Sequence, residues 1–165
     1  LYICWGAQAG LYHHYGIQKQ NLDDKIFGIF KNYKTTVAEP LLRGFDDIFP
    51  APQSRHTEIK SEDIKKHPEL TILAESEQSG VLLVKSNDNR QIFMTGHLEY
   101  DTETLGVEYR RDLDQGKKIK MPENYYPNND PWNTPISTWR SHAHLFYSNW
   151  LNYYVYQATP FNFAD

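Results

Sequence analysis

The sequence predicts a single α/β domain, and three features along the chain lead to this class. A strand, a tight turn and a helix occupy residues 1–15. Three strand-like segments lie between residues 71 and 95, and two helical patterns follow them. A chain of 165 residues is long enough for one core, whereas two ordinary domains need about 100–200 residues each. We therefore expect residues 1–165 to form one domain.

The first element is an apolar strand, Leu1-Tyr2-Ile3, that ends at the only cysteine, Cys4. Residues 5–15 are compatible with a helix, and Gly16 is suited to end it. A strand that turns sharply into a helix forms a nucleophile elbow, in which the helix dipole favours a thiolate. The alternative is a buried cysteine that packs as a small apolar side chain. Because a parallel strand needs neighbours, we expect N-terminal strands of this sheet in sequence before Leu1.

The central strands are the clearest ones in the chain. Pro50-Ala51-Pro52 predicts an extended loop. Strands are predicted at residues 71–75, 80–85 and 91–95, with Asn87-Asp88-Asn89 as the turn between the last two. These segments predict a strand followed by a β-hairpin.

Two helices complete the pattern. The first begins after Asp101-Thr102-Glu103 and continues to about residue 114, with Gly116 at its end and an apolar stripe formed by Leu105, Tyr109 and Leu113. The second begins near Ser137. Its apolar positions recur at spacings of three and four, and they are Ile136, Trp139, Ala143, Phe146, Trp150 and Tyr153. These aromatic side chains are expected in the core or at the interface of a homodimer.

Composition narrows the classes of partner. The chain has 17 basic and 21 acidic residues, and it has no dense Lys/Arg block, so neither nucleic acid nor a membrane surface is indicated. A lone cysteine cannot form an internal disulfide, and no long apolar run predicts a membrane span. A cytoplasmic location is therefore expected.

A candidate general base lies at the end of the last predicted strand. Successive side chains of an extended chain point to opposite faces, so His97 and Glu99, which are two residues apart, point the same way. Glu99 could accept from one ring nitrogen while the other nitrogen faces the Cys4 thiol. Since a free thiol is only a few per cent thiolate at neutral pH, an adjacent imidazole would raise its reactive fraction. The alternative for His97 is a structural histidine, but the elbow favours a Cys4, His97 and Glu99 triad.

The whole chain resembles the homoserine O-acyltransferases, which are the O-succinyl- and O-acetyltransferases of methionine biosynthesis. Seven segments carry this resemblance in order: Ile3-Cys4-Trp5-Gly6-Ala7-Gln8-Ala9, Leu42-Arg43-Gly44-Phe45-Asp46-Asp47, Pro52-Gln53-Ser54-Arg55, Thr95-Gly96-His97-Leu98-Glu99-Tyr100-Asp101, Asn128-Asn129-Asp130-Pro131-Trp132-Asn133-Thr134-Pro135, Trp139-Arg140-Ser141-His142 and Asn149-Trp150-Leu151-Asn152-Tyr153-Tyr154.

The resemblance implies the three-layer, flavodoxin-like fold of class I glutamine amidotransferases, with this chain as the C-terminal part of the catalytic domain. It implies that Cys4 takes an acyl group from acyl-CoA as a thioester, that His97 accepts protons and that Glu99 is its partner. The co-substrates would be L-homoserine and acetyl-CoA or succinyl-CoA, with overall similarity leaning toward acetyl. No metal and no further cofactor is implied.

The resemblance also implies substrate contacts at Lys25, Ser54 and Arg111. Lysine and guanidinium groups suit the carboxylate of an amino acid. Taken alone, these residues could instead be a strand end, a turn residue and a helix surface charge paired with Glu108 or Asp114. Leu98 departs from the family pattern, in which many relatives have proline.

Two other functions compete with acyl transfer. A class I glutaminase passes through the same kind of thioester, but it usually has glycine on both sides of its cysteine, whereas Ile3 precedes Cys4 here. The other alternative is a non-catalytic fragment that keeps the fold without the remaining groups of the site.

Overall fold

The computed structural model describes residues 1–36 and 38–160. Its centre is a sheet in the order β1-β6-β5-β4-β2-β3, in which only β1 and β6 run parallel and all other neighbours are antiparallel. The strands are β1 (Tyr2–Ile3), β2 (Gln20–Lys34), β3 (Ile48–Glu58), β4 (Leu70–Ser76), β5 (Gly80–Ser86) and β6 (Ile92–Met94).

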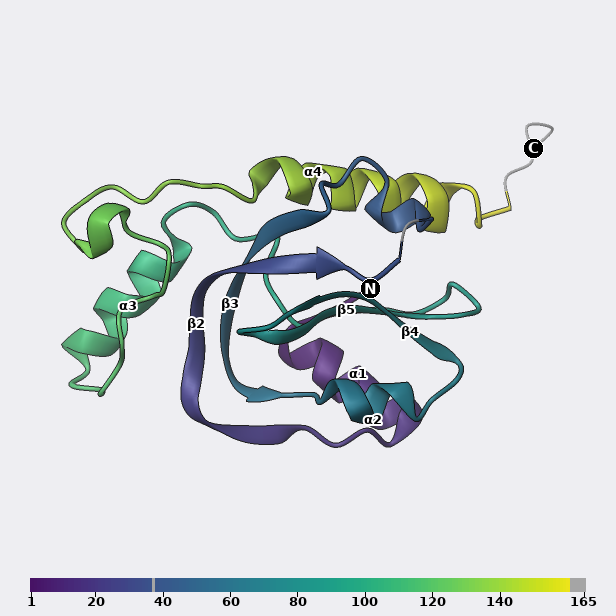
Figure 1. The fold of residues 1–165 in the computed structure, drawn as a ribbon, viewed down its shortest axis with the longest axis horizontal. Coiled ribbons are helices and arrows are strands. Elements are labelled where there is room, and N and C mark those ends of the chain that lie inside the picture. Colours follow the sequence, from purple (N-terminus) through teal and green to yellow (C-terminus); the bar gives the residue numbers. More distant parts are fainter. Residues whose placement is uncertain (37, 161–165) are drawn as a thin grey trace.

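Helices cover both faces of this sheet (Figure 1). They are α1 (Trp5–Tyr15), α2 (Ser61–Lys65), α3 (Thr104–Asp114) and α4 (Arg140–Asn149), with short 3-10 helices at Pro40–Leu42 and Pro127–Asn129. A π-helical segment, Trp150–Tyr156, continues α4. In Figure 1, α1 and α2 lie below the central strands, α4 lies above them, and α3 stands beside the β2–β3 ribbon. None of the helices in the described residues is both long and apolar enough to cross a membrane.

Two apolar clusters fill the spaces between these layers. On the α4 side, fully buried side chains include Phe49, Leu82, Met94, Trp139 and Phe146. On the α1 and α2 side, they include Ala7, Leu11, Ile64, Val84 and Phe93. Phe93 and Met94, which are adjacent in β6, thus enter different clusters, as expected for a strand buried on both faces. The predicted three-layer α/β class is confirmed.

Most predicted elements are confirmed, including the helix at 5–15 and the three central strands. Gly16 ends α1 with φ 70° and ψ 10°, a left-handed conformation that glycine adopts readily. The apolar stripe of α3 is only partly confirmed, because Leu105 is buried but Leu113 is 46% exposed. Ile136 is likewise exposed, and it lies before α4 begins.

The predicted loop at Pro50-Ala51-Pro52 is wrong, because these residues lie within β3. Pro50 stands opposite Lys31 and Pro52 opposite Ile29 in the ladder with β2. Proline cannot donate a ladder hydrogen bond, but β3 is the edge strand of the described sheet and needs donors on one side only. The extended conformation that proline favours is therefore used in a strand.

The β2–β3 hairpin extends well beyond the rest of the sheet. β2 contacts β4 in register only at Tyr33 and Lys34, so most of the hairpin curves away as a two-stranded ribbon (Figure 1). Its register shifts between Asn21 and Ile26, and such a bulge redirects nearby side chains. The ribbon brings residues of β2 and β3 toward α3.

Candidate active site

Cys4 lies at the elbow between β1 and α1 in a rare backbone conformation. Its φ is 51° and its ψ is −117°, and a non-glycine residue in such a region costs about 1–3 kcal/mol. The Cys4 N–H donates to the Met94 carbonyl oxygen over 2.7 Å, which fixes the elbow to the end of β6. Strain of this kind is typical of functional sites, and here the strained backbone conformation places a half-buried thiol at the first turn of α1.

His97 and Glu99 form a close pair just after β6. His97 Nδ1 lies 2.6 Å from Glu99 Oε1. The pair arises from a turn rather than from the strand alternation predicted above, because the Tyr100 N–H donates to the His97 carbonyl oxygen over 3.2 Å. Tyr100 stacks on the imidazole with ring centres 4.1 Å apart. The ring is thus held on one edge by a carboxylate and on one face by an aromatic ring.

The environment of His97 favours its charged form. Burial alone would lower the pKa of the imidazole, but hydrogen bonds with the Cys4 and Glu99 side chains, together with their negative charges, raise this pKa to about 9. An imidazole with this pKa is protonated at neutral pH. The structure therefore brings Cys4, His97 and Glu99 together, with a positive charge between a thiol and a carboxylate.

Gly96 allows the His97 turn to approach β3. The His97 N–H donates to the Pro52 carbonyl oxygen over 2.9 Å. A methyl group added at Gly96 would lie 2.6 Å from Leu82 Cδ1 and 2.9 Å from the Pro52 carbonyl oxygen. Only a residue without a side chain fits between these atoms, so Gly96 fixes the height of the imidazole above the sheet.

Lys25, Ser54 and Arg111, the three predicted substrate contacts, all meet one carboxylate. Glu108 of α3 accepts from Lys25 Nζ over 2.6 Å and from Ser54 Oγ over 2.9 Å, and it lies 3.7 Å from the Arg111 guanidinium. We call these four residues the Glu108 cluster. The Lys25 and Glu108 side chains are only 11% and 19% exposed, so this ion pair is largely removed from solvent.

Ser54 connects the Glu108 cluster to the thiol. The Cys4 Sγ lies 3.9 Å from the Ser54 carbonyl oxygen, while the Ser54 hydroxyl donates to Glu108. Gln8 of α1 strengthens this junction, because its side chain donates to the Thr57 carbonyl oxygen over 3.1 Å and accepts from the Thr57 hydroxyl over 2.6 Å. The elbow helix and the strand that carries Ser54 are therefore joined at Thr57 as well as at the thiol.

Comparisons with known proteins show the family of this chain. A family model described as homoserine O-succinyltransferase matches residues 1–161. The chain belongs to the homoserine O-succinyltransferase family. It is 62% identical over 161 residues to a homoserine O-acetyltransferase of Geobacillus sp. (strain WCH70), with 98% of this chain and 53% of the relative covered. A homoserine O-acetyltransferase of Bacteroides fragilis is 58% identical over 165 residues, which is 100% of this chain and 54% of the relative. The chain thus spans about half the length of the curated relatives it matches.

Solved structures show the fold independently. A glutamine amidotransferase from Thermotoga maritima superposes with a TM-score of 0.61 at 16% identity, covering 93% of this chain and 61% of that one. A glutamine amidotransferase from Methylobacillus flagellatus has a TM-score of 0.57 at 14% identity, covering 90% and 61% of the two chains. The predicted class I glutamine amidotransferase-like fold is confirmed.

Within this family member, three residues of the site were not predicted from the sequence as functional. The sequence predicts Glu108 only as a surface partner of Arg111, and its position three residues earlier on the same helix is the signal for their contact. Asp112, rather than Asp114, is the second partner of Arg111, at 2.8 Å. The third is Arg55, whose buried guanidinium lies close enough to Cys4 for the negative charge of the cysteine to act on it. Burial lowers the pKa of Arg55, and the negative charges of Glu58 and Cys4 oppose that shift.

Proposed function

We propose that this chain carries the catalytic groups of a homoserine O-acyltransferase of methionine biosynthesis that works in the cytoplasm. The acyl group would pass from acyl-CoA to Cys4 and then to the hydroxyl of L-homoserine. The observation that carries this proposal is that the Cys4 thiol contacts two groups of side chains. One is the His97–Glu99 pair, which suits acyl transfer. The other, reached through Ser54, is the Glu108 cluster of opposite charges, which suits an amino acid that bears both an ammonium and a carboxylate.

In the first half-reaction, the Cys4 thiolate attacks the thioester carbonyl carbon of acyl-CoA. The new carbon–sulfur bond gives a tetrahedral intermediate, which collapses as the bond to the coenzyme sulfur breaks, and the His97 imidazolium gives its proton to the departing thiolate. The raised pKa of His97 supports this role, because the proton is present when it is needed. The first N–H groups of α1 have no partners inside the helix and lie beside Cys4, where they can stabilise the tetrahedral oxyanion.

In the second half-reaction, neutral His97 accepts the proton of the homoserine hydroxyl as its oxygen attacks the Cys4 thioester. The carbon–oxygen bond forms, Cys4 leaves as a thiolate, and His97 is again an imidazolium. Glu99 holds Nδ1 over 2.6 Å and so directs the other ring nitrogen toward the reacting atoms. Protons and electron pairs balance over the two steps without a metal or a redox cofactor.

The Glu108 cluster provides charges for both ends of the homoserine zwitterion. The Glu108 carboxylate can accept from the ammonium, and the cations of Arg111 and Lys25 can donate to the carboxylate. Arg111 is the accessible one of the two cations, with 55% of its side chain exposed against 11% for Lys25. The substrate would therefore enter beside Arg111 and exchange its own charges for those already paired within the cluster.

The donor is proposed to be acetyl-CoA, because the curated relatives at 56–62% identity are named homoserine O-acetyltransferases. The test is steady-state turnover of L-homoserine by the full-length protein with acetyl-CoA, with succinyl-CoA and, separately, with glutamine alone. We expect O-acetylhomoserine and free coenzyme A as products, with acetyl-CoA as the better donor. Glutamine hydrolysis without acyl transfer would assign the site to a glutaminase, and no turnover of any substrate would favour a non-catalytic chain.

A further inference from the structure

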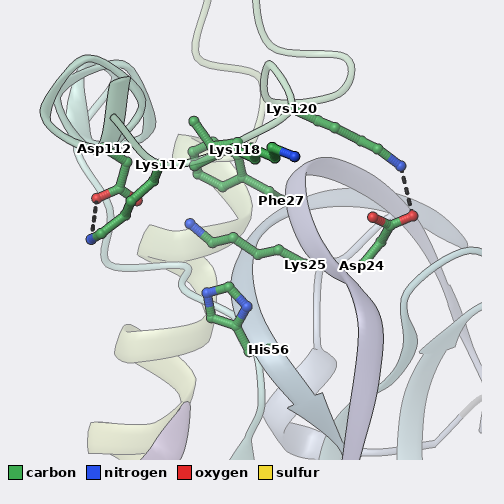
Figure 2. A pocket seen from close by; sticks show the side chains of 9 residues that line it. Asp24, Lys25, Phe27, His56, Asp112, Lys117, Lys118 and Lys120 are labelled. Atoms are coloured by element: carbon green, nitrogen blue, oxygen red, sulfur yellow. Dashed lines mark hydrogen bonds and ion pairs between the residues drawn. The ribbon is translucent and has the colours of Figure 1, made fainter. Parts of the chain in front are cut away.

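A cavity rich in lysine lies between the β2–β3 ribbon and the loop that follows α3. Its volume is about 430 Å³, which is within the range of small-molecule sites. Lys25 and His56 line it from the two strands, and Lys117, Lys118 and Lys120 line it from the loop. Figure 2 shows these two groups of side chains facing one another across the hollow. We call this feature the lysine cavity.

The charges of the lysine cavity are only partly balanced. Lys117 Nζ lies 3.0 Å from Asp112 Oδ1, and Lys120 Nζ lies 2.6 Å from Asp24 Oδ2, as the dashed lines in Figure 2 mark. Asp112 also binds Arg111, so its charge is shared between two cations. Lys118 has no ion-pair or hydrogen-bond partner among the described residues, and it is exposed. The cavity therefore presents an excess of positive charge in a chain whose net charge is −4.

The backbone of the lysine-bearing loop is fixed at both ends. At its start, the Lys117 N–H donates to the Asp112 carbonyl oxygen over 3.0 Å. At its end, the Glu123 N–H donates to the Phe27 carbonyl oxygen over 2.9 Å, and the Ile29 N–H donates to the Glu123 carbonyl oxygen over 2.8 Å. Gly28 permits this close approach, because a side chain at that position would collide with the Glu123 backbone. The backbone that carries the lysines is thus fixed at both ends before any ligand binds.

One residue joins the lysine cavity to the candidate active site. Lys25 lines the cavity and also binds Glu108, which binds Ser54, whose carbonyl oxygen contacts the Cys4 thiol. A molecule that reaches from the thiol past the Glu108 cluster would therefore place its far end among the lysines. The donor in the proposed reaction is such a molecule, with a reactive thioester at one end and phosphate groups at the other.

We propose that the lysine cavity binds the phosphate groups of the nucleotide end of the acyl-CoA donor. This inference rests on the proposed function. Lysine suits this role because its ammonium is a compact charge that pairs with phosphate without strict geometry. The net negative charge of the chain, together with a cavity of about 430 Å³, favours a small phosphorylated ligand over a nucleic acid.

The kinetic test compares two donors in the full-length protein, acetyl-CoA and acetyl-pantetheine, which lacks the nucleotide and its phosphates. Lys118→Glu reverses a charge that has no partner in the described structure, and Lys65→Glu on α2 is the matched control at another exposed lysine. We expect the ratio of kcat/KM for acetyl-CoA to kcat/KM for acetyl-pantetheine to fall about tenfold in Lys118→Glu and to stay unchanged in Lys65→Glu. This ratio should also fall as ionic strength rises, since phosphate pairing is screened by salt.

A binding measurement separates this inference from the proposed function. Adenosine 3′,5′-bisphosphate, which is the nucleotide end of coenzyme A without the second phosphate of its diphosphate, is titrated calorimetrically into the wild type and both variants, with inorganic phosphate as a second probe. We expect about tenfold weaker nucleotide binding in Lys118→Glu only, and weaker binding of phosphate than of nucleotide to the wild type. Acetyl transfer with an unchanged donor ratio and unchanged nucleotide binding in Lys118→Glu would overturn the lysine cavity assignment alone. Nucleotide binding lost in Lys118→Glu but without acyl transfer by the wild type would overturn the proposed function alone.

Discussion

The Cys4 and His97 site and the Glu108 cluster are neighbours, but backbone hydrogen bonds position the first and side-chain ion pairs position the second. Cys4 and His97 are fixed through their own backbone N–H groups, which bind the Met94 and Pro52 carbonyl oxygens over 2.7 and 2.9 Å. Lys25 and Arg111 are instead positioned by side-chain ion pairs with Glu108 at 2.6 and 3.7 Å. The first region therefore has one arrangement, whereas the second can exchange partners.

This difference matches what each region has to do in the proposed reaction. The thiol must meet the carbonyl carbon and the imidazole must reach the transferred proton in every cycle, and a misplacement of about 1 Å can cost about a hundredfold in rate. The Glu108 cluster must open to admit a zwitterion and close after the product leaves. Ion pairs made within the cluster can be replaced by ion pairs with the substrate, so opening the cluster costs less than breaking buried charges without replacement.

The largest expected effect comes from removing either reacting group. His97→Ala and Cys4→Ala should each lower kcat in the full-length protein by about a thousandfold or more, because neither step has a substitute proton carrier or nucleophile. Their thermal unfolding midpoints are measured alongside turnover. Near-normal turnover in either folded variant would show that the triad is not the catalytic unit.

The next effect tests the backbone-fixed region without touching a reacting group. Gly96→Ala should lower kcat about a hundredfold, because the added methyl group collides with the Pro52 carbonyl oxygen and Leu82 and displaces His97. It should also destabilise the fold by about 1–3 kcal/mol. Gly6→Ala is the stability control, since a methyl group there meets nothing within 4 Å. Equal unfolding free energies for the two variants would contradict the close approach at Gly96.

The side-chain region should respond differently. Glu108→Gln keeps the shape of the side chain but removes the charge, so we expect KM for homoserine to rise about tenfold or more while kcat changes less. Asp114→Asn, at an exposed position of the same helix, is the matched control and should leave both constants unchanged. An equal loss of kcat and kcat/KM in Glu108→Gln would mean that Glu108 acts on the transition state instead.

The raised pKa of His97 predicts a pH dependence of stability. The pKa is about 9 in the folded state against 6.5 in the unfolded chain, so the proton stabilises the folded protein fully below pH 6.5, and this contribution is lost as the pH rises through 9. Over this shift the pH-dependent part amounts to at most about 3 kcal/mol. Denaturant unfolding of wild type and His97→Gln between pH 6 and pH 10 measures it. A difference in unfolding free energy that grows with pH has the wrong sign for this account.

The smallest effect is expected at Leu98, where many relatives have proline. Leu98 follows His97 in the turn closed by Tyr100, and its N–H makes no backbone hydrogen bond in the described residues. Proline is favoured at this place in a turn, although the buried leucine side chain would be lost. Leu98→Pro should therefore keep kcat within about threefold of the wild type, since it leaves His97 and Glu99 in place. Loss of folding would show that the Leu98 N–H or its φ angle matters.

The sequence predicted local structure well where a single residue type decides the conformation. The elbow helix at 5–15 ends at Gly16 because only a residue suited to positive φ fits there, and the central strands follow from their apolar runs. The proline-rich strand β3 was missed, because its tolerance for proline depends on its being an edge strand. That position is a property of the whole sheet and leaves no local signal in the sequence.

The candidate site likewise divides into residues with a local signal in the sequence and residues whose contacts depend on the whole fold. Cys4, His97 and Glu99 could be predicted because elbow and base lie at the ends of recognisable strands, although a turn rather than strand alternation pairs His97 with Glu99. Lys25, Ser54 and Arg111 came from the family resemblance, and their meeting at Glu108 depends on the curvature of the β2–β3 ribbon toward α3. Neither the curvature nor the lysine cavity beside it can be read from spacing along the chain.

The most direct test of the central claim is to trap the acyl-enzyme. The full-length protein is incubated with acetyl-CoA in the absence of homoserine, and peptide mass mapping locates any acetyl group. We predict acetylation of Cys4, its removal when homoserine is added, and no acetylation of the same peptide in Cys4→Ala. Turnover of homoserine without an acetyl group on Cys4, or with the group on another residue, would contradict the account.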